Sequence, residues 1–302
     1  MPTELRTERR LVSLPDGRDL DVLLTGPEDG IPLVIQEGTP IGLGIYPPTA
    51  DAAIERDLRV ILVARPGYER STPRPGRRVG DVPEDIAAVL DHLGADTFVT
   101  YGASGGGPHA LACAAKLPGR CLAAASVAGA PPFNAEGVDF LAGMSPENVA
   151  EFGAAVEGID PLSRHLEKEA EGLRGVTGDQ VVSAFDSMLS AADKAALTGE
   201  YASTVAALLR AAVSSGIAGW RDDDIALVSD WGFELARLSA PVAVWHGEED
   251  RMGPFAFGQW LAAHIPGART RLLPGEGHLS IQTNRVGDIL SDLLDMAGLA
   301  PR

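Results

Sequence analysis

Short apolar runs alternate with amphipathic runs along most of the chain, and this pattern predicts strands that alternate with helices. Two alternating runs, residues 9–14 and 19–25, flank the turn sequence Pro15-Asp16-Gly17 and predict a β-hairpin. Residues 81–93 carry apolar side chains at helical spacing. Apolar runs of strand length occupy residues 32–36, 59–64, 97–101 and 122–128. We therefore predict an α/β fold with a mostly parallel sheet covered by helices on both faces, whose ligand crevice lies at the carboxyl ends of the strands.

The alternation stops between residues 131 and 238, where Ala, Leu, Glu and Ser recur at helical spacing without a convincing strand. Candidate helices there span residues 146–156, 161–173, 178–189, 191–198 and 201–216. The alternation resumes with a strand at 241–246, a helix at 254–264, a strand at 270–273 and a closing helix at 284–296. We predict a core formed by residues 1–130 and 239–302, and a helical cap formed by residues 131–238 that shapes a substrate pocket.

Composition narrows the possible partners. The 302 residues carry a formal net charge of −17, which opposes nucleic acid or an anionic membrane as a partner, because both reward a basic face. The chain begins without an apolar signal-type segment and has no apolar stretch long enough to span a bilayer. Cys113 and Cys121 fall in predicted core elements, as reduced cysteines do. We expect a cytoplasmic protein that acts on a small molecule, and the sequence leaves open whether it forms a homo-oligomer.

A candidate nucleophile stands in Gly102-Ala103-Ser104-Gly105-Gly106, between the strand at 97–101 and the helical run at 108–116. A Gly-x-Ser-x-Gly sequence in that setting is typical of a nucleophile elbow. A side chain two positions before or after the serine would crowd the strained turn. We expect the Ser104 hydroxyl at the carboxyl edge of the sheet, with the Gly105 amide near the positive end of a helix.

A serine nucleophile needs a base, and the base needs an orienting acid. With a nucleophile elbow the expected chain order is serine, acid, histidine. Asp250 follows the strand at 241–246, and we prefer it to its neighbours Glu248 and Glu249. Of six histidines, only His278 lies on a glycine-flanked loop after the last predicted strand. We predict Ser104, Asp250 and His278 as the catalytic residues.

An oxyanion that forms during acyl transfer needs two backbone donors. One is the amide of Gly105. The other should come from Gly38-Thr39-Pro40, after the strand at 32–36. Because proline has no amide hydrogen, we choose the amide of Thr39.

These motifs together resemble those of the α/β-hydrolase fold superfamily, and the resemblance covers nearly the full chain. The matching pieces are Gly38-Thr39-Pro40, Arg65-Pro66-Gly67-Tyr68-Glu69-Arg70-Ser71, Gly102-Ala103-Ser104-Gly105-Gly106, Gly247-Glu248-Glu249-Asp250-Arg251 and Gly277-His278. The resemblance implies a Ser104–His278–Asp250 triad, a helical cap and no cofactor. A serine at the elbow argues against the epoxide hydrolases and dehalogenases of this superfamily, which use an aspartate there.

The chain departs from the superfamily pattern in two loops. Glu37 stands where the oxyanion loop often has a histidine. We expect its carboxylate to brace the loop by accepting backbone hydrogen bonds, because a carboxylate that faced the oxyanion would oppose the developing charge. Ala64 and Glu69 replace the usual aspartate and second glycine in the loop after the strand at 59–64.

The default expectation is hydrolysis of a small carboxylic ester through an acyl enzyme. A peptidase of the proline-iminopeptidase type would use the same residues and would need cap carboxylates to hold a substrate amine. Candidates for that role are Glu151, Glu157, Asp160 and Asp222 to Asp224. A cofactor-free lyase, a perhydrolase and a non-catalytic binder of small molecules remain as alternatives. Candidate apolar residues of the pocket are Phe133, Phe140, Met144, Phe185, Met188, Trp220 and Trp231.

Overall fold

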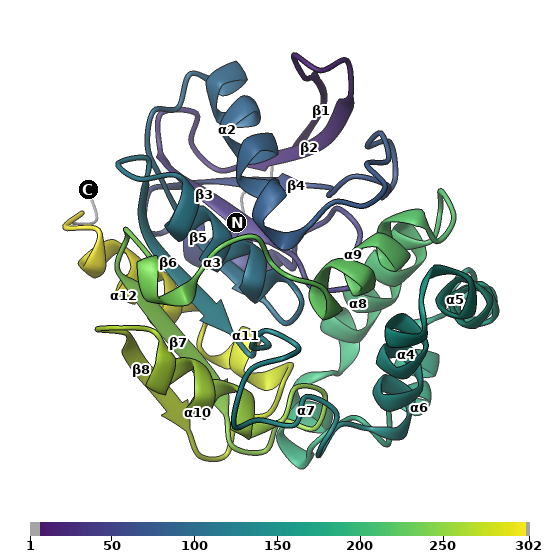
Figure 1. Ribbon diagram of the computed structural model, residues 1–302. Helices are drawn as coiled ribbons and strands as arrows, with labels where there is room; N and C mark the ends of the chain where they lie inside the picture. The colour runs from purple at the N-terminus through teal and green to yellow at the C-terminus, as the bar shows by residue number, and fades with distance from the viewer. Residues whose placement is uncertain (1–6, 300–302) are drawn as a thin grey trace.

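An eight-stranded sheet forms the centre of the molecule in the computed structural model, which describes residues 7–299 (Figure 1). The strands are β1 (Thr7–Ser13), β2 (Asp19–Thr25), β3 (Ile31–Gln36), β4 (Leu58–Val63), β5 (Phe98–Ala103), β6 (Cys121–Val127), β7 (Val242–Gly247) and β8 (Arg269–Leu273). Their order is β1-β2-β4-β3-β5-β6-β7-β8. Strands β3 to β8 run parallel, whereas β1 and β2 form an antiparallel hairpin at one edge. The predicted fold class and hairpin are confirmed.

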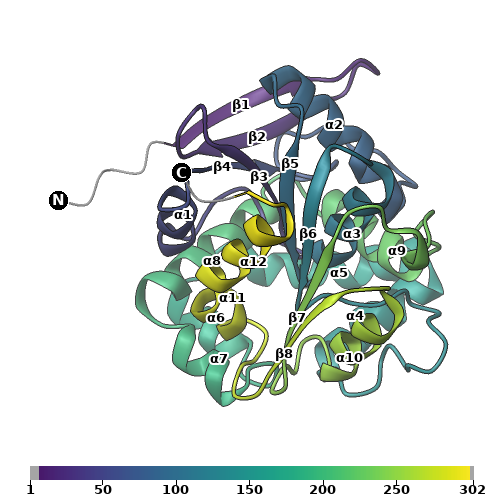
Figure 2. The ribbon, with the colours of Figure 1, turned by 90° about the vertical axis from the view of Figure 1, so that its left-hand side faces the viewer.

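Helices cover both faces of the sheet (Figure 2). The helices α1 (Pro47–Ile54) and α12 (Val286–Met296) pack on one face. The helices α2 (Val82–Leu93), α3 (Gly106–Lys116) and α10 (Phe255–His264) pack on the other. The central strands β5, β6 and β7 are therefore buried on both faces, which explains why they are continuous apolar runs rather than alternating ones.

Between β6 and β7 the chain forms six helices, which we call the α4–α9 segment. They are α4 (Pro146–Glu157), α5 (Ile159–Leu173), α6 (Gly178–Ala184), α7 (Ala191–Ala196), α8 (Gly199–Ala212) and α9 (Ala218–Val228). Figure 1 shows them gathered beside one end of the sheet. The five helices that we predicted there are present, although α6 ends five residues early. The division of the chain into a core and a cap stays a prediction.

The sequence pattern did not predict α9 or a short helix after β8. Helix α9 was missed because buried aspartates interrupt its apolar face, so it lacks the spacing that marks an amphipathic helix. Helix α11 (Ser280–Asn284) is too short to show any periodicity. Within residues 7–299, no helix has the length and apolar character needed to cross a membrane.

Candidate active site

Ser104 lies at the turn from β5 into α3, in a backbone conformation that is strained for a residue with a side chain. Its φ angle is 52°, in the left-handed region. A Cβ atom on Gly102 would lie 2.0 Å from the carbonyl oxygen of Gly106, and one on Gly106 would lie 2.0 Å from that of Gln36. The turn can close only with glycine at both positions, as the elbow motif predicts.

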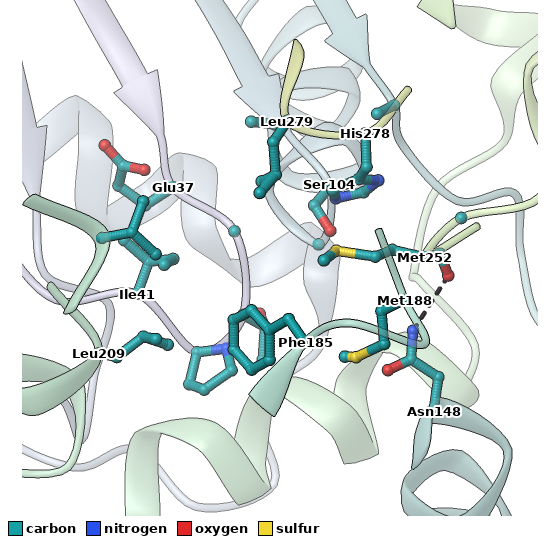
Figure 3. Close-up of a pocket in the computed structure, with 18 of the residues that line it drawn as sticks. Glu37, Ile41, Ser104, Asn148, Phe185, Met188, Leu209, Met252, His278 and Leu279 are labelled. Carbon is teal, nitrogen blue, oxygen red and sulfur yellow. Dashed lines mark hydrogen bonds between the residues drawn. The ribbon is translucent and has the colours of Figure 1, made fainter. Parts of the chain in front are cut away.

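The structure brings His278 and Asp250 to the same edge of the sheet. Asp250 follows β7, and His278 follows β8. The Nδ1 atom of His278 lies 2.8 Å from Asp250 Oδ2. The other carboxylate oxygen, Oδ1, accepts hydrogen bonds from the amides of Met252 and Gly253, at 2.9 and 2.8 Å. Figure 3 shows the imidazole of His278 beside the hydroxyl of Ser104. The three predicted residues therefore lie at one edge of the sheet, where Ser104 and His278 line the same cavity, and their catalytic role stays a prediction.

The electrostatics of this pair favour an ionised acid and a basic imidazole. Burial alone would raise the pKa of Asp250, but the charge of His278 and the hydrogen bonds from His246 and His278 outweigh it and hold the pKa below its ordinary range. Burial alone would lower the pKa of His278, but the charge and hydrogen bond of Asp250 raise it. Because Nδ1 is bonded to Asp250, the Nε2 atom of His278 is the one available to a substrate or to Ser104.

A second histidine contacts Asp250, and the sequence analysis gave it no role. His246 is buried on β7, with Nε2 2.8 Å from the carbonyl oxygen of Gly253 and 3.3 Å from Asp250 Oδ2. Because a carbonyl only accepts, Nε2 carries the hydrogen. His246 therefore fixes the turn that presents Asp250. Its position four residues before the acid was the one signal for this contact.

Thr39 and Gly105 lie side by side next to the elbow. A Cβ atom on Gly105 would be 2.7 Å from Thr39 Oγ1 and 3.4 Å from the Thr39 amide nitrogen. One on Gly38 would lie 3.4 Å from Ser104 Cβ. In the part of the chain that the structure describes, neither the Thr39 amide nor the Gly105 amide donates a hydrogen bond. The two predicted donors therefore have no partner among these residues, and their role at an oxyanion stays a prediction.

The oxyanion loop is held by Arg65, whose contribution the sequence analysis did not foresee. Its guanidinium donates to the carbonyl oxygens of Glu37 and Gly38, at 2.7 and 3.0 Å. It also pairs with Asp223 of α9, at 2.5 Å. The hydroxyl of Thr39 donates to the same carboxylate at 2.9 Å. The buried Arg65–Asp223 ion pair therefore holds the loop that carries Thr39.

Asp223 is the hub of this cluster. It also accepts a hydrogen bond from Tyr68, at 2.9 Å, and pairs with Arg77, at 2.6 Å. Burial alone would raise the pKa of Asp223, but the charges of Arg65 and Arg77 outweigh it and hold the pKa well below its ordinary value. The run of three aspartates at 222–224 was the available signal, although the sequence analysis interpreted it as a site for a substrate amine.

The expectation for Glu37 was wrong. Its carboxylate accepts no hydrogen bond from the described residues and points away from Ser104 (Figure 3). Arg65 supplies the brace instead, through the Glu37 carbonyl. Burial raises the pKa of Glu37 to about 7, against the lowering influence of Arg65. At the other departure, Glu69 has a φ angle of 45° and so takes the left-handed conformation in which the superfamily often has glycine.

A cavity of about 640 Å³ opens above Ser104 and His278, between the sheet edge and the α4–α9 segment. Phe140, Met144, Phe185, Met188 and Trp220 line it as expected, but Phe133 and Trp231 do not. The Nδ2 atom of Asn148 on α4 donates to the Met252 carbonyl oxygen at 3.0 Å and ties α4 to the Asp250 turn (Figure 3). The cavity is large enough for a small organic ester.

The acidic and basic side chains that line the cavity are unequal in number. Five of its side chains are carboxyl groups, and among the described residues no lysine or arginine lines it. The carboxyl groups belong to Glu37, Glu147, Glu151, Glu169 and Asp224. Of the six cap acids that we considered for binding an amine, only Glu151 and Asp224 line the cavity. Glu157 and Asp160 are exposed outside it, and Asp222 and Asp223 pair with arginines.

Glu151 and Asp224 form a close carboxyl pair. Burial and their mutual proximity raise the pKa of Asp224 well above its ordinary value. Burial also raises the pKa of Glu151, although the Trp220 indole donates to Glu151 Oε1 at 2.7 Å. Burial and the proximity of the two carboxyl groups therefore disfavour the state in which both are ionised. No group of three or more histidine, cysteine, aspartate or glutamate side chains within residues 7–299 is arranged to hold a metal ion.

A parallel sheet with a strained serine at the turn after β5, and with an acid and a histidine after its last two strands, defines the class of α/β-hydrolase folds. Sequence comparison agrees, because the model of the alpha/beta hydrolase fold family matches residues 31–284. The chain belongs to this family.

Three similar proteins indicate the range of the family around this chain. A non-heme chloroperoxidase from Streptomyces lividans is 31% identical over 147 residues, which are 48% of this chain and 53% of that protein. The chain thus matches about half the length of that relative. A 2-hydroxy-6-oxononadienedioate/2-hydroxy-6-oxononatrienedioate hydrolase from Cupriavidus pinatubonensis is 27% identical over 73% of this chain and 70% of that protein. A bromoperoxidase from Bacillus anthracis shares the fold, with a TM-score of 0.70, 19% identity, and coverage of 96% of this chain and 100% of that one.

Proposed function

We propose that the protein is a serine hydrolase that cleaves small, uncharged carboxylic esters through an acyl enzyme. One observation carries the proposal: the Ser104 hydroxyl stands on a strained elbow beside an imidazole whose other nitrogen is bonded to a buried carboxylate. A nucleophile, a base and an orienting acid in that arrangement are the requirements for acyl transfer.

The proposed reaction begins when Nε2 of His278 takes the proton of Ser104 as Oγ attacks the carbonyl carbon. The amides of Gly105 and Thr39 hold the oxyanion. His278 then gives the proton to the departing alkoxide, and the acyl group stays on Oγ. Water enters, His278 takes one of its protons, and the hydroxide attacks the acyl carbon. The carboxylic acid leaves as the proton returns to Ser104. Asp250 orients the imidazole and stabilises its charged form in both halves.

The charge of the cavity supports an uncharged substrate. A dicarboxylate, such as the name of the Cupriavidus relative denotes, would need cationic side chains to replace its lost hydration. The described lining offers carboxyl groups instead. We therefore rank ester hydrolysis above cleavage of a dianionic carbon skeleton.

A second candidate is an aminopeptidase-type activity on small amides. The Glu151–Asp224 pair favours it, because two neighbouring carboxyl groups on the cavity wall can accept hydrogen bonds from a substrate ammonium. Asp224 is buried and lines the cavity, and Trp220, an aromatic residue of the kind that can contact a cation, lines the same cavity.

The test is turnover of a panel of 4-nitrophenyl esters of short neutral acids by the protein and by Ser104→Ala. We expect the variant to lose at least about 10³-fold in kcat/KM, because the triad acts as a unit. A fluorophosphonate probe should label Ser104, as mapped by mass spectrometry of the modified peptide. Hydrolysis that survives the substitution, or label on another residue, would remove the proposal.

Three further assays separate the alternatives. Amino-acid 4-nitroanilides report the aminopeptidase candidate, and peracid formation from an ester and hydrogen peroxide reports perhydrolysis, to which the similarity to chloroperoxidase points. Tight binding of an ester without turnover, measured by calorimetry, would make the protein a binder.

A further inference from the structure

A carboxylate from the α4–α9 segment grips the loop that carries His278. Asp193 lies on α7, 85 residues before His278 in the chain. Its Oδ1 accepts hydrogen bonds from the amides of Leu279 and Ser280, at 2.7 and 2.9 Å. Its Oδ2 lies 3.2 Å from the amide of His278 itself. Asp193 is fully buried, so these three bonds are shielded from water and correspondingly strong.

Asp193 is itself held firmly. It occupies the first turn of α7, where its Oδ2 accepts a 2.9 Å hydrogen bond from the Ser190 hydroxyl, and that hydroxyl accepts one from the Asp193 amide at 3.1 Å. This reciprocal cap fixes the side chain relative to its own helix. The position of α7 therefore fixes the position of the backbone at His278, because Asp193 links the two.

The contact is too close to be incidental. A Cβ atom on Gly277 would lie 2.3 Å from both Asp193 Oδ2 and Ser190 Oγ. Only glycine before the histidine allows the first turn of α7 to reach the loop. The glycine that we used to recognise His278 in the sequence is thus explained by this contact.

Other hydrogen bonds of the loop do not replace this one. The hydroxyl of Ser280 bonds to the Gly277 amide and to Glu276, and Gln282 donates to the His278 carbonyl oxygen. Those bonds shape the loop internally. Among the described residues, Asp193 alone accepts from the three consecutive amides at 278–280 and joins them to another part of the fold.

We propose that Asp193 is a positioning residue, which fixes the imidazole of His278 relative to Ser104 and so makes assembly of the active site depend on the docking of α7. The proposal rests on the proposed function. It assigns the α4–α9 segment a part in the chemistry beyond shaping the cavity.

The charge of Asp193 gives the proposal a signature that a purely structural contact lacks. The charged groups that face His278 are Asp250, after β7, and Asp193, on α7, and both raise the pKa of His278 against the lowering effect of burial. His246 faces Asp250 from β7. Replacement of Asp193 by asparagine removes one negative charge and keeps the shape of the side chain. The pKa of His278 should then fall.

The experiment compares Asp193→Asn with the parent protein and with Asp186→Asn, which removes an exposed carboxylate of the same segment that pairs with Lys194. We expect kcat/KM for a neutral 4-nitrophenyl ester to fall about 10- to 100-fold in Asp193→Asn, mainly through kcat, because a displaced base loses its reach to Ser104. The acid limb of the pH profile should move to lower pH by about half a unit or more. Asp186→Asn should match the parent in both respects.

A measurement without turnover separates this proposal from the proposed function. The pKa of His278 is read from its imidazole NMR signals, assigned by their loss in His278→Gln, in each variant. An unchanged His278 pKa together with an unchanged pH profile in folded Asp193→Asn would overturn the positioning role, even if activity fell. If the parent protein hydrolyses no ester, the proposed function fails, while the NMR titration still decides the role of Asp193.

A second variant tests the proposal in case Asp193→Asn does not fold. Ser190→Ala keeps the carboxylate of Asp193 but removes the hydroxyl that anchors it. We expect kcat to fall less in Ser190→Ala than in Asp193→Asn, and the acid limb of the pH profile to stay at the parent position. Thermal unfolding followed by circular dichroism checks that the variant is folded. A Ser190→Ala protein whose rate equals that of the parent would contradict a role for the anchored geometry.

Discussion

At Glu37, the surroundings of the carboxyl group oppose its negative charge. Its carboxyl group lines the cavity with no hydrogen-bond partner among the described residues, and burial raises its pKa from 4.5 to about 7. Because the folded state holds the proton more tightly than the unfolded state, the free energy of unfolding should fall as the pH rises from about 4.5 through 7. Glu37→Gln carries no such charge. We expect it to match the parent at pH 4.5 and to exceed it by about 2 kcal/mol at pH 8.5.

Urea unfolding at both pH values measures this difference, and Glu28→Gln, in an exposed loop, is the matched control. A stability gain at pH 4.5 as large as that at pH 8.5 would show that the effect is not titration of the carboxyl group. A loss of stability at pH 8.5 would mean that the charged form has a partner.

The success and failure of sequence reasoning at single residues follow from how local the cause is. The elbow glycines could be predicted because they are neighbours of Ser104 and the clash is within the turn. The orientation of the Glu37 side chain could not be predicted. The loop is held instead by Arg65, which lies 28 residues further along the chain and donates to the Glu37 carbonyl oxygen. Asp193 lies 85 residues before the loop that it holds, and no spacing rule links the two.

Helix α9 joins the α4–α9 segment to the oxyanion loop through a single carboxylate. Asp223→Asn would leave Arg65 and Arg77 buried without their counter-charge. We expect a loss of about 3–5 kcal/mol in the free energy of unfolding, measured by urea titration, because an unpaired buried charge is costly. Where the variant remains folded, kcat should fall as well, since Arg65 also holds the carbonyl oxygens of Glu37 and Gly38.

The control is Asp222→Asn on the same helix, whose partner Arg221 lies partly exposed. It should cost clearly less than Asp223→Asn, because Arg221 keeps its access to water when the negative charge is removed. Equal losses of stability in the two variants would mean that any such substitution destabilises α9. The loss in Asp223→Asn would then not arise from its ion pairs with Arg65 and Arg77.

Elements of the sheet were predictable, whereas parts of the α4–α9 segment were not. Strands buried on both faces must be apolar throughout, so β5, β6 and β7 are marked by composition alone. Helix α9 buries three aspartates, and one of them, Asp223, pairs with Arg65 and Arg77 from elsewhere in the fold. The sequence of α9 therefore looks polar although the helix is buried. Tertiary pairing of charges overrides the helical pattern there.

At the scale of the whole molecule, charge and shape act together on the choice of substrate. The chain carries a formal net charge of −17, and the carboxyl groups that line the cavity with Ser104 carry charge of the same sign where they are ionised. Long-range repulsion is screened by salt, whereas repulsion inside a buried cavity is screened much less. The two contributions can therefore be separated by ionic strength.

We expect the protein to hydrolyse 4-nitrophenyl butyrate at least about 10-fold faster, in kcat/KM, than the mono-4-nitrophenyl ester of succinate, because the second ester must bring a carboxylate into an acidic cavity. Raising the salt concentration from 20 mM to 500 mM should remove only a minor part of the difference, since most of the repulsion arises inside the cavity.

A matched 4-nitrophenyl ester of 4-aminobutyrate should not suffer the penalty, and Glu151→Gln should erase any advantage that its ammonium group confers. Glu157→Gln, an exposed acid outside the cavity, controls for the net charge. Equal rates for the neutral and anionic esters would show that the acidic lining takes no part in selection.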